Sequence, residues 1–175
     1  MRKKYTKNTL KNKLRNIKLL ILDVDGVLTD GKLIYNSDGI ELKAFDVKDG
    51  YGLVRLKQAG VKLGIITAKS SSIVETRAKD LGIDALYQNV GDKLTAYTDI
   101  KEKYDLTDDA IAYIGDDVPD LGVLKQTGVP IAVHDAVEAV KNTTVYITKK
   151  CGGNGAVREV VELIMQAKGI PLSQP

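Results

Sequence analysis

Two clusters of aspartates each follow a short apolar run. Asp23 and Asp25 come directly after the run IKLLIL at residues 17–22, and the cluster GDDVPD at 115–120 follows the run AIAYI at 110–114. If both runs are parallel strands of one sheet, their carboxylates meet at the same edge. Carboxylates about 4 Å apart repel by roughly 4 kcal/mol at an effective dielectric of 20, and a hard divalent cation removes that cost. The two clusters therefore predict a magnesium site with oxygen ligands.

Each cluster also has a simpler interpretation. Asp116 or Asp117 could cap a following helix that carries Pro119 in its first turn, and Asp25 with Gly26 could form an ordinary turn. Because both clusters stand at the ends of core-type strands, the metal site is the favoured interpretation.

Two further residues are of the kind that holds a phosphate. Thr67 ends the apolar run at 61–66, where its hydroxyl and the backbone N–H of Ala68 could bind a phosphate oxygen. Lys93 opens a predicted helix, and its ammonium could neutralise both a phosphate and an attacking carboxylate. Taken singly, simpler roles are favoured, a helix N-cap for Thr67 and a surface lysine for Lys93.

An alternation of apolar runs and helical patterns positions these residues. Strands are predicted at 17–22, 61–66, 85–88, 110–114, 129–133 and 145–148. Helices are predicted at about 50–59, 71–81, 92–104, 118–127 and 155–168. Near-continuous apolar strands are typical of a parallel sheet with helices on both faces, so the chain predicts an α/β fold with an open, Rossmann-like sheet.

One segment breaks this alternation. Residues 32–46 hold two extended runs around the turn sequence NSDG, which predicts a β-hairpin inserted after the first strand. We expect a basic arm at 1–16, a single domain at 17–168 and a tail at 169–175.

The charge is unevenly distributed. The formal net charge is +3, but residues 1–22 carry eight Lys and Arg and no acid. Such an arm could bind nucleic acid or anionic lipid. A solvated leader helix with apolar contacts at Leu10, Leu14 and Ile17 is the favoured interpretation, because few aromatic residues accompany the charges. We therefore expect neither nucleic acid nor membrane as a partner.

Composition excludes several other classes. One cysteine, Cys151, permits neither an intramolecular disulfide nor a cysteine zinc cluster, and His134 is the one histidine. There is no GxGxxG after the first strand and no GxxxxGK[ST] loop, which argues against dinucleotide enzymes and P-loop NTPases. A cytoplasmic location is expected, since no apolar run approaches about 20 residues and no secretory leader is evident.

The motifs occur in the order DxDGV, Thr after a strand, Lys at a helix start, and GDDxxD. This order resembles the haloacid dehalogenase superfamily of phosphotransferases. The resemblance implies that Asp23 is the nucleophile and Asp25 the general acid/base, and that Asp23, Asp116 and the Asp25 carbonyl bind Mg²⁺. It implies the following supporting and phosphate-binding residues: Asp117, Asp120, Thr67, Ala68 and Lys93. Ala68 and Pro119 depart from the usual Gly and Asn, at positions whose side chains the chemistry does not need.

The spacing of the motifs leaves little room for a cap domain. The crevice should therefore be open within one chain, and a neighbouring subunit or a macromolecular substrate must exclude water. The segments FDVKDGYG at 45–52 and CGGNGAVRE at 151–159 favour a subunit, because with the other motifs they resemble the cap-less, homotetrameric 3-deoxy-D-manno-octulosonate 8-phosphate phosphatases over residues 17–166. That family acts in lipopolysaccharide precursor synthesis.

This second resemblance implies partners and substrate contacts. The hairpin at 32–46 and the loop Gly152–Gly155 would lie at subunit interfaces. The substrate would be a small phosphorylated sugar acid, contacted by Lys48, Gly50 and Lys69, although Arg is more usual at the last position.

Three alternatives stay open. The substrate could be another sugar acid phosphate, such as a nine-carbon keto-sugar acid 9-phosphate. The chain could be a non-catalytic tetramerisation module, although its intact acidic motifs argue against this. A two-component receiver domain also gathers aspartates around Mg²⁺, but it would carry its phosphoacceptor in the middle of the chain rather than after the first strand.

Overall fold

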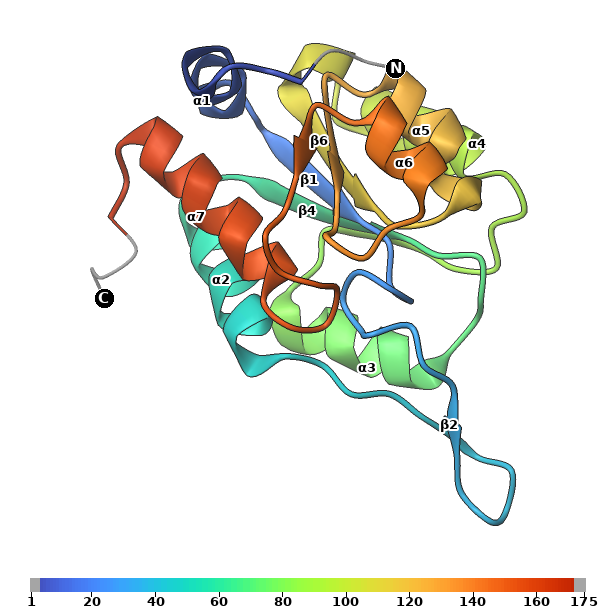
Figure 1. Ribbon diagram of the computed structural model, residues 1–175. Helices are drawn as coiled ribbons and strands as arrows, with labels where there is room; N and C mark the ends of the chain where they lie inside the picture. The colour runs from blue at the N-terminus through green and yellow to red at the C-terminus, as the bar shows by residue number, and fades with distance from the viewer. Residues whose placement is uncertain (1–3, 172–175) are drawn as a thin grey trace.

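A six-stranded parallel sheet forms the centre of the computed structural model, which describes residues 4–171 (Figure 1). Its order is β5-β4-β1-β6-β7-β8. The strands are β1 (Leu19–Leu22), β4 (Lys62–Ile66), β5 (Ala85–Tyr87), β6 (Ile111–Gly115), β7 (Val129–Ala132) and β8 (Tyr146–Ile147). All six lie within two residues of the predicted runs, and the predicted Rossmann-like fold is confirmed.

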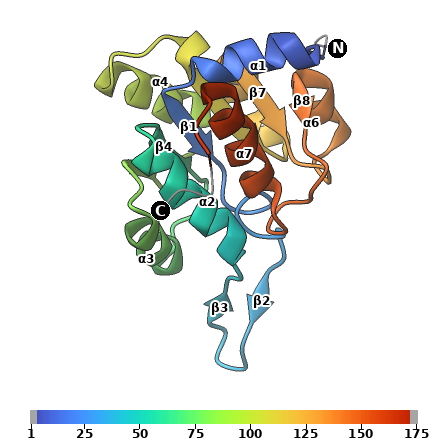
Figure 2. The same cartoon turned by 90° about the vertical axis from the view of Figure 1, so that its left-hand side faces the viewer.

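Helices cover both faces of the sheet. They are α1 (Lys7–Arg15), α2 (Val47–Gln58), α3 (Ser72–Leu81), α4 (Lys93–Lys103), α5 (Leu121–Gln126), α6 (Glu138–Thr143) and α7 (Ala156–Lys168). Contacts join α7 to α1 and α2, and α2 to α3, whereas α5 contacts α4 and α6 (Figures 1 and 2). Because β1 is covered on both sides, all four of its side chains are 0% exposed.

Two helical segments differ from the prediction. The segment predicted as one helix at 118–127 is a 3-10 turn, Val118–Asp120, followed by the short α5. Asp117 and Asp120 form a capping box around this turn, which carries Pro119 near its start, and α5 begins only at Leu121. The sequence prediction also missed α6, which spans six residues.

Helix capping fixes where two functional segments begin. The carboxylate of Asp46 accepts a hydrogen bond from Lys48 N at 2.6 Å and starts α2. The Asp92 carboxylate accepts from Leu94 N at 3.0 Å and starts α4, so Lys93 is the first residue of that helix. Its backbone position is therefore set by the residue before it.

The predicted hairpin projects from the body (Figure 2). It pairs β2 (Ile34–Tyr35) with β3 (Glu41–Leu42) in antiparallel register, with Ile34 opposite Leu42. The side-chain oxygen of Asn36 accepts hydrogen bonds from two backbone N–H groups within the turn, and Gly39 adopts a φ of +76° there.

The basic N-terminal segment forms α1, whose Leu10 and Leu14 are buried and which packs against α7. The division into an arm, a domain and a tail stays a prediction, and residues 1–3 and 172–175 lie outside the described residues. Among the described residues, no helix combines the length and hydropathy needed to cross a bilayer.

Candidate active site

The predicted acidic clusters meet in one crevice at the carboxyl ends of β1, β4 and β6. The register places Leu22 beside Ile65 and Ile114, so the residues that follow these strands emerge together. The crevice has a volume of about 300 Å³. It is lined by Asp23, Asp25, Gly31, Thr67, Ala68, Lys69, Lys93, Asp116, Asp117 and Pro119.

Asp23 is held at the floor of the crevice and is 8% exposed. Its Oδ1 accepts a hydrogen bond from Val24 N at 2.6 Å, and its Oδ2 lies 2.7 Å from Lys93 Nζ. Burial, followed by the nearby Asp120 carboxylate, raises the pKa of Asp23 to about 6 in the metal-free chain, against the opposing effect of Lys93. A positive charge at this edge therefore favours the ionised form of Asp23.

Lys93 links the two acidic clusters. Its side chain is 4% exposed and its ammonium lies 2.7 Å from Asp23 and 2.8 Å from Asp120. Burial alone would lower the pKa of Lys93, but the two carboxylates outweigh it and raise the pKa. Lys93 is thus a buried cation and not the surface lysine of the simpler interpretation.

Asp120 is fully buried beneath the crevice and binds several of the groups around it. Its Oδ1 accepts a hydrogen bond from the Tyr113 hydroxyl at 2.6 Å, and its Oδ2 accepts from the backbone N–H groups of Asp116 and Asp117 at 2.9 and 3.3 Å. Tyr113 is not among the residues that the motifs predicted. The signal was a phenol within an otherwise aliphatic strand, because a fully buried hydroxyl needs a polar partner.

Three carboxylates are close enough to share a cation. Asp23, Asp116 and Asp120 each offer one oxygen, and these oxygens lie within 4.8 Å of one another. Both Asp120 oxygens already accept hydrogen bonds, so we regard Asp120 as a supporting residue. Asp116 Oδ1 is buried without a hydrogen-bond partner among the described residues, and burial, followed by Asp23 and Asp120, raises the Asp116 pKa to about 8. An orphaned oxygen in an all-oxygen cluster fits Mg²⁺.

The other predicted residues of the crevice lie at its sides. Asp25 Oδ1 is 2.5 Å from Lys43 Nζ, and Asp25 Oδ2 is 3.9 Å from Lys69 Nζ. Thr67 is 3% exposed, and its hydroxyl oxygen accepts from Lys69 N at 3.4 Å. Asp117 caps the turn that follows it by accepting a hydrogen bond from Val118 N, which confirms the capping interpretation for this residue.

Glycines allow the acidic loops to approach. Gly26 has a φ of +90°, and a Cβ there would lie 2.1 Å from Asp116 Oδ2. A Cβ on Gly152 would lie 1.7 Å from the Gly26 carbonyl oxygen, and Gly153 N donates to Val27 O at 3.0 Å. The Gly-rich loop therefore packs behind the active-site loop of its own chain.

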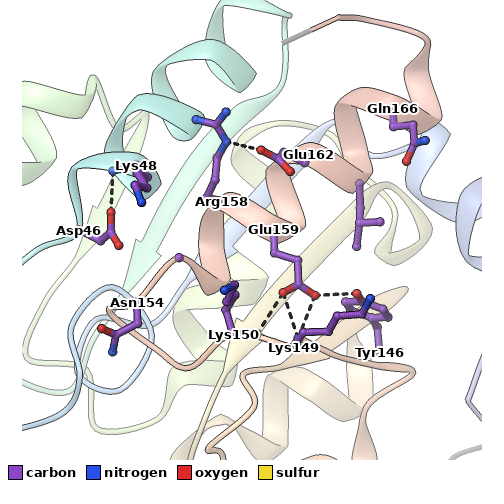
Figure 3. Close-up of a pocket in the computed structure, with 12 residues that line it drawn as sticks. Asp46, Lys48, Tyr146, Lys149, Lys150, Asn154, Arg158, Glu159, Glu162 and Gln166 are labelled. Atoms are coloured by element: carbon purple, nitrogen blue, oxygen red, sulfur yellow. Dashed lines mark hydrogen bonds and ion pairs between the residues drawn. The ribbon is translucent and has the colours of Figure 1, made fainter. Parts of the chain in front are cut away.

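The structure does not bring Lys48 and Gly50 to this crevice within one chain. Gly50 is buried on α2, where a Cβ would lie 2.3 Å from the Arg77 guanidinium. Lys48 lines a separate pocket of about 460 Å³ between α2 and α7. Figure 3 shows Lys48 there on the side opposite Lys149 and Lys150. The residues that line the crevice do not include Lys48 or Gly50, which the motif alone does not reveal.

Hydrogen bonds join several of the residues that line the Lys48 pocket. Glu159 accepts hydrogen bonds from the Tyr146 hydroxyl at 2.7 Å and from Lys149 N at 2.9 Å (Figure 3). Arg158 Nε donates to Glu162 at 2.7 Å. The acids of this pocket thus bind neighbouring groups of its walls, while Lys48 lies outside the acidic crevice.

This chain is similar in sequence and in fold to several known proteins. A family model of haloacid dehalogenase-like hydrolases matches residues 85–160. The 3-deoxy-D-manno-octulosonate 8-phosphate phosphatase KdsC of Escherichia coli is 44% identical over 157 residues, which are 90% of this chain and 84% of that protein. The phosphatase of the same name from Moraxella catarrhalis, whose crystal structure contains magnesium, phosphate and KDO, is 49% identical, with a TM-score of 0.90 and coverage of 93% of each chain. The Yersinia pestis phosphatase is 42% identical with a TM-score of 0.89, over 91% of this chain and 86% of that one.

Proposed function

Since this chain belongs to the family of 3-deoxy-D-manno-octulosonate 8-phosphate phosphatases within the haloacid dehalogenase-like hydrolases, we propose that it hydrolyses that sugar acid phosphate through an aspartyl-phosphate on Asp23. The products are the free sugar acid, a precursor of lipopolysaccharide, and inorganic phosphate. One observation carries this function: Asp23, Lys93 and Asp116 converge in a single crevice at the end of β1.

In the first half-reaction a carboxylate oxygen of Asp23 attacks phosphorus, and the bond from phosphorus to the sugar oxygen breaks. Lys93, 2.7 Å from that carboxylate, offsets the repulsion between nucleophile and phosphate. The Thr67 hydroxyl and the Ala68 N–H bind a phosphate oxygen, and Asp25 gives its proton to the departing sugar oxygen.

The second half-reaction restores the enzyme. Asp25, now ionised, takes a proton from a water molecule whose oxygen attacks the phosphorus of the aspartyl-phosphate. The bond from phosphorus to Asp23 breaks, phosphate leaves, and both carboxyl groups return to their starting states. An aspartate at position 25 can perform both proton transfers, which favours turnover over a stable phosphorylated state.

Magnesium is the cofactor. We propose that Asp23, Asp116 and the backbone carbonyl of Asp25 hold it, with Asp117 and Asp120 in support, and the orphaned Asp116 oxygen is the observation that fits. When bound, Mg²⁺ neutralises phosphate charge and stabilises the charge of the transferring phosphoryl group.

Magnesium should stabilise the protein more at pH 8 than at pH 6. The pKa of Asp116 is raised to about 8 and that of Asp23 to about 6, so the metal-free folded chain binds protons more tightly than the unfolded chain. Its stability should therefore fall as the pH rises from about 4 towards about 8, and cation binding, which needs ionised ligands, should recover that loss.

Thermal unfolding in EDTA and in saturating MgCl₂ at each pH measures this prediction. We expect the magnesium-induced rise in Tm to be larger at pH 8 than at pH 6 by about 3 °C or more. In Asp116→Asn we expect the magnesium-induced rise itself to disappear. An equal rise at both pH values would contradict the assignment.

Phosphate release tests the substrate. We expect the eight-carbon sugar acid 8-phosphate to be turned over with a kcat/KM about tenfold or more above that of the nine-carbon 9-phosphate analogue. The reverse preference would select the nine-carbon alternative. If neither compound releases phosphate in the presence of magnesium, the proposal is rejected and the non-catalytic module is the remaining alternative.

We also propose that the chain assembles into a homotetramer through its hairpin. Five apolar side chains of the hairpin are exposed by 46–59%, namely Leu33, Ile34, Tyr35, Ile40 and Leu42. Such a patch on a projecting ribbon is typical of an interface. A neighbouring subunit would also cover the open crevice and could bring Lys48 and the Gly152–Gly155 loop towards an anionic substrate. The cytoplasmic location stays a prediction.

Placing two lysines in the cross-strand pair of the hairpin should dissociate this assembly. Ile34 and Leu42 lie opposite each other, so Ile34→Lys with Leu42→Lys adds facing like charges to the proposed interface. Light scattering should show the mass fall below that of a tetramer, while Val137→Lys, at an exposed position outside the hairpin, should not change it. A wild-type chain that is monomeric would refute the tetramer.

A further inference from the structure

Lys43, a residue of the hairpin segment, contacts Asp25 in the crevice. It follows β3 directly, and its side chain is 2% exposed. Its ammonium lies 2.5 Å from Asp25 Oδ1 and 3.1 Å from Glu41 Oε1. Glu41 and Lys43 are two residues apart, so their side chains lie on the same side of the extended arm. A lysine buried to this degree depends on its two carboxylate partners, because an unpaired charge there would be costly.

The two carboxylate oxygens of Asp25 have different neighbours. Oδ1 is held by the buried ammonium, whereas Oδ2 lies 3.9 Å from the ammonium of Lys69, whose side chain is 51% exposed. Asp25 and Lys69 both line the crevice. The terminal torsion of an aspartate is broad, but the two oxygens belong to one planar group, so a contact that holds Oδ1 restricts the directions in which Oδ2 can point.

We propose that Lys43 is a positioning residue that holds Asp25 with Oδ2 directed at the reacting oxygen in both half-reactions. This inference rests on the acid/base role proposed for Asp25. That carboxyl must give a proton to the sugar oxygen and later take one from water at nearly the same place, and such groups need placement within about 0.5 Å. Since Lys43 belongs to the hairpin arm, the seating of the hairpin also sets the placement of Asp25.

The chemistry of the leaving group tests this role. Lys43→Met removes the charge at similar length, Lys43→Arg retains a charge, and Lys32→Met is the matched control on the same hairpin, at a side chain that is 75% exposed. Each is assayed with the sugar acid phosphate, whose alkoxide must be protonated as it leaves, and with p-nitrophenyl phosphate, whose phenolate leaves without a proton.

For Lys43→Met we expect kcat/KM to fall about tenfold or more with the sugar acid phosphate and by about twofold or less with p-nitrophenyl phosphate. Lys43→Arg should recover most of the loss, and Lys32→Met should stay within about twofold of the wild type for both substrates. In an Asp25→Asn background, Lys43→Met should add a loss of about twofold or less, because its effect passes through Asp25.

A purely structural role gives a different result. Damage to the fold, to magnesium binding or to the active fraction lowers kcat/KM by the same factor for both substrates, so equal losses would overturn the proposal. A Lys43→Met protein whose kcat/KM for the sugar acid phosphate is unchanged would overturn it as well. If circular dichroism shows Lys43→Met to be unfolded, Lys43→Gln is measured with the same two substrates. A wild-type chain that hydrolyses neither substrate would instead reject the proposed function.

Discussion

Replacing Asp23 with Asn is expected to abolish phosphate release and leave the protein folded. The amide is not a nucleophile towards phosphorus, so the aspartyl-phosphate cannot form, and we expect kcat to fall by about four orders of magnitude or more. The side chain keeps its size, and its oxygen can still accept the hydrogen bond from Val24 N. Burial already raises the pKa of Asp23, so a neutral group at this position is well tolerated by the fold.

The assay for this prediction has three readouts. Phosphate release measures turnover, acid-quenched protein measures the covalent intermediate, and thermal unfolding measures stability. Asp109→Asn makes the same chemical change at an exposed side chain that pairs with Lys13, and it should keep kcat within about twofold. An Asp23→Asn protein with near-wild-type turnover, or with phosphate bound covalently elsewhere, would remove Asp23 from the mechanism.

Replacing Lys93 with Met is expected to lower both activity and stability. The change leaves the buried carboxylates of Asp23 and Asp120 facing each other without the ammonium that lies 2.7 and 2.8 Å from them. Removing one partner of a buried ion pair costs about 3–5 kcal/mol. Losing a charge that stabilises the transition state should lower kcat by about two to three orders of magnitude.

A second substitution separates the two effects of Lys93. The double variant Lys93→Met with Asp120→Asn removes one of the uncompensated charges, so it should recover part of the free energy of unfolding but none of the activity. Urea denaturation and phosphate release measure the two quantities, and Lys125→Met, at an exposed site on α5, should change neither. A folded Lys93→Met protein with wild-type kcat would contradict the role assigned to this residue.

The sequence by itself determined the sheet and the meeting of the two acidic clusters at its edge. The run IKLLIL predicted a buried strand because uninterrupted apolar side chains need cover on both faces, and β1 has that cover. Asp23 follows it directly, and the GDD cluster follows β6 in the same way. Parallel strands bring such ends to one edge, so local patterns sufficed to predict a site that joins residues 23 and 116.

Only the tertiary structure decided how that edge is built. Three contacts could not be read from local patterns: the hydroxyl of Tyr113 on Asp120, the ammonium of Lys43 on Asp25, and the Gly152 backbone against Gly26. Lys48, whose motif suggested the crevice, lies in another pocket. These placements depend on how the hairpin, α2 and α7 pack against the body. Such packing arises from many contacts between distant residues, whereas the strand pattern is set by the side chains of a few neighbouring residues.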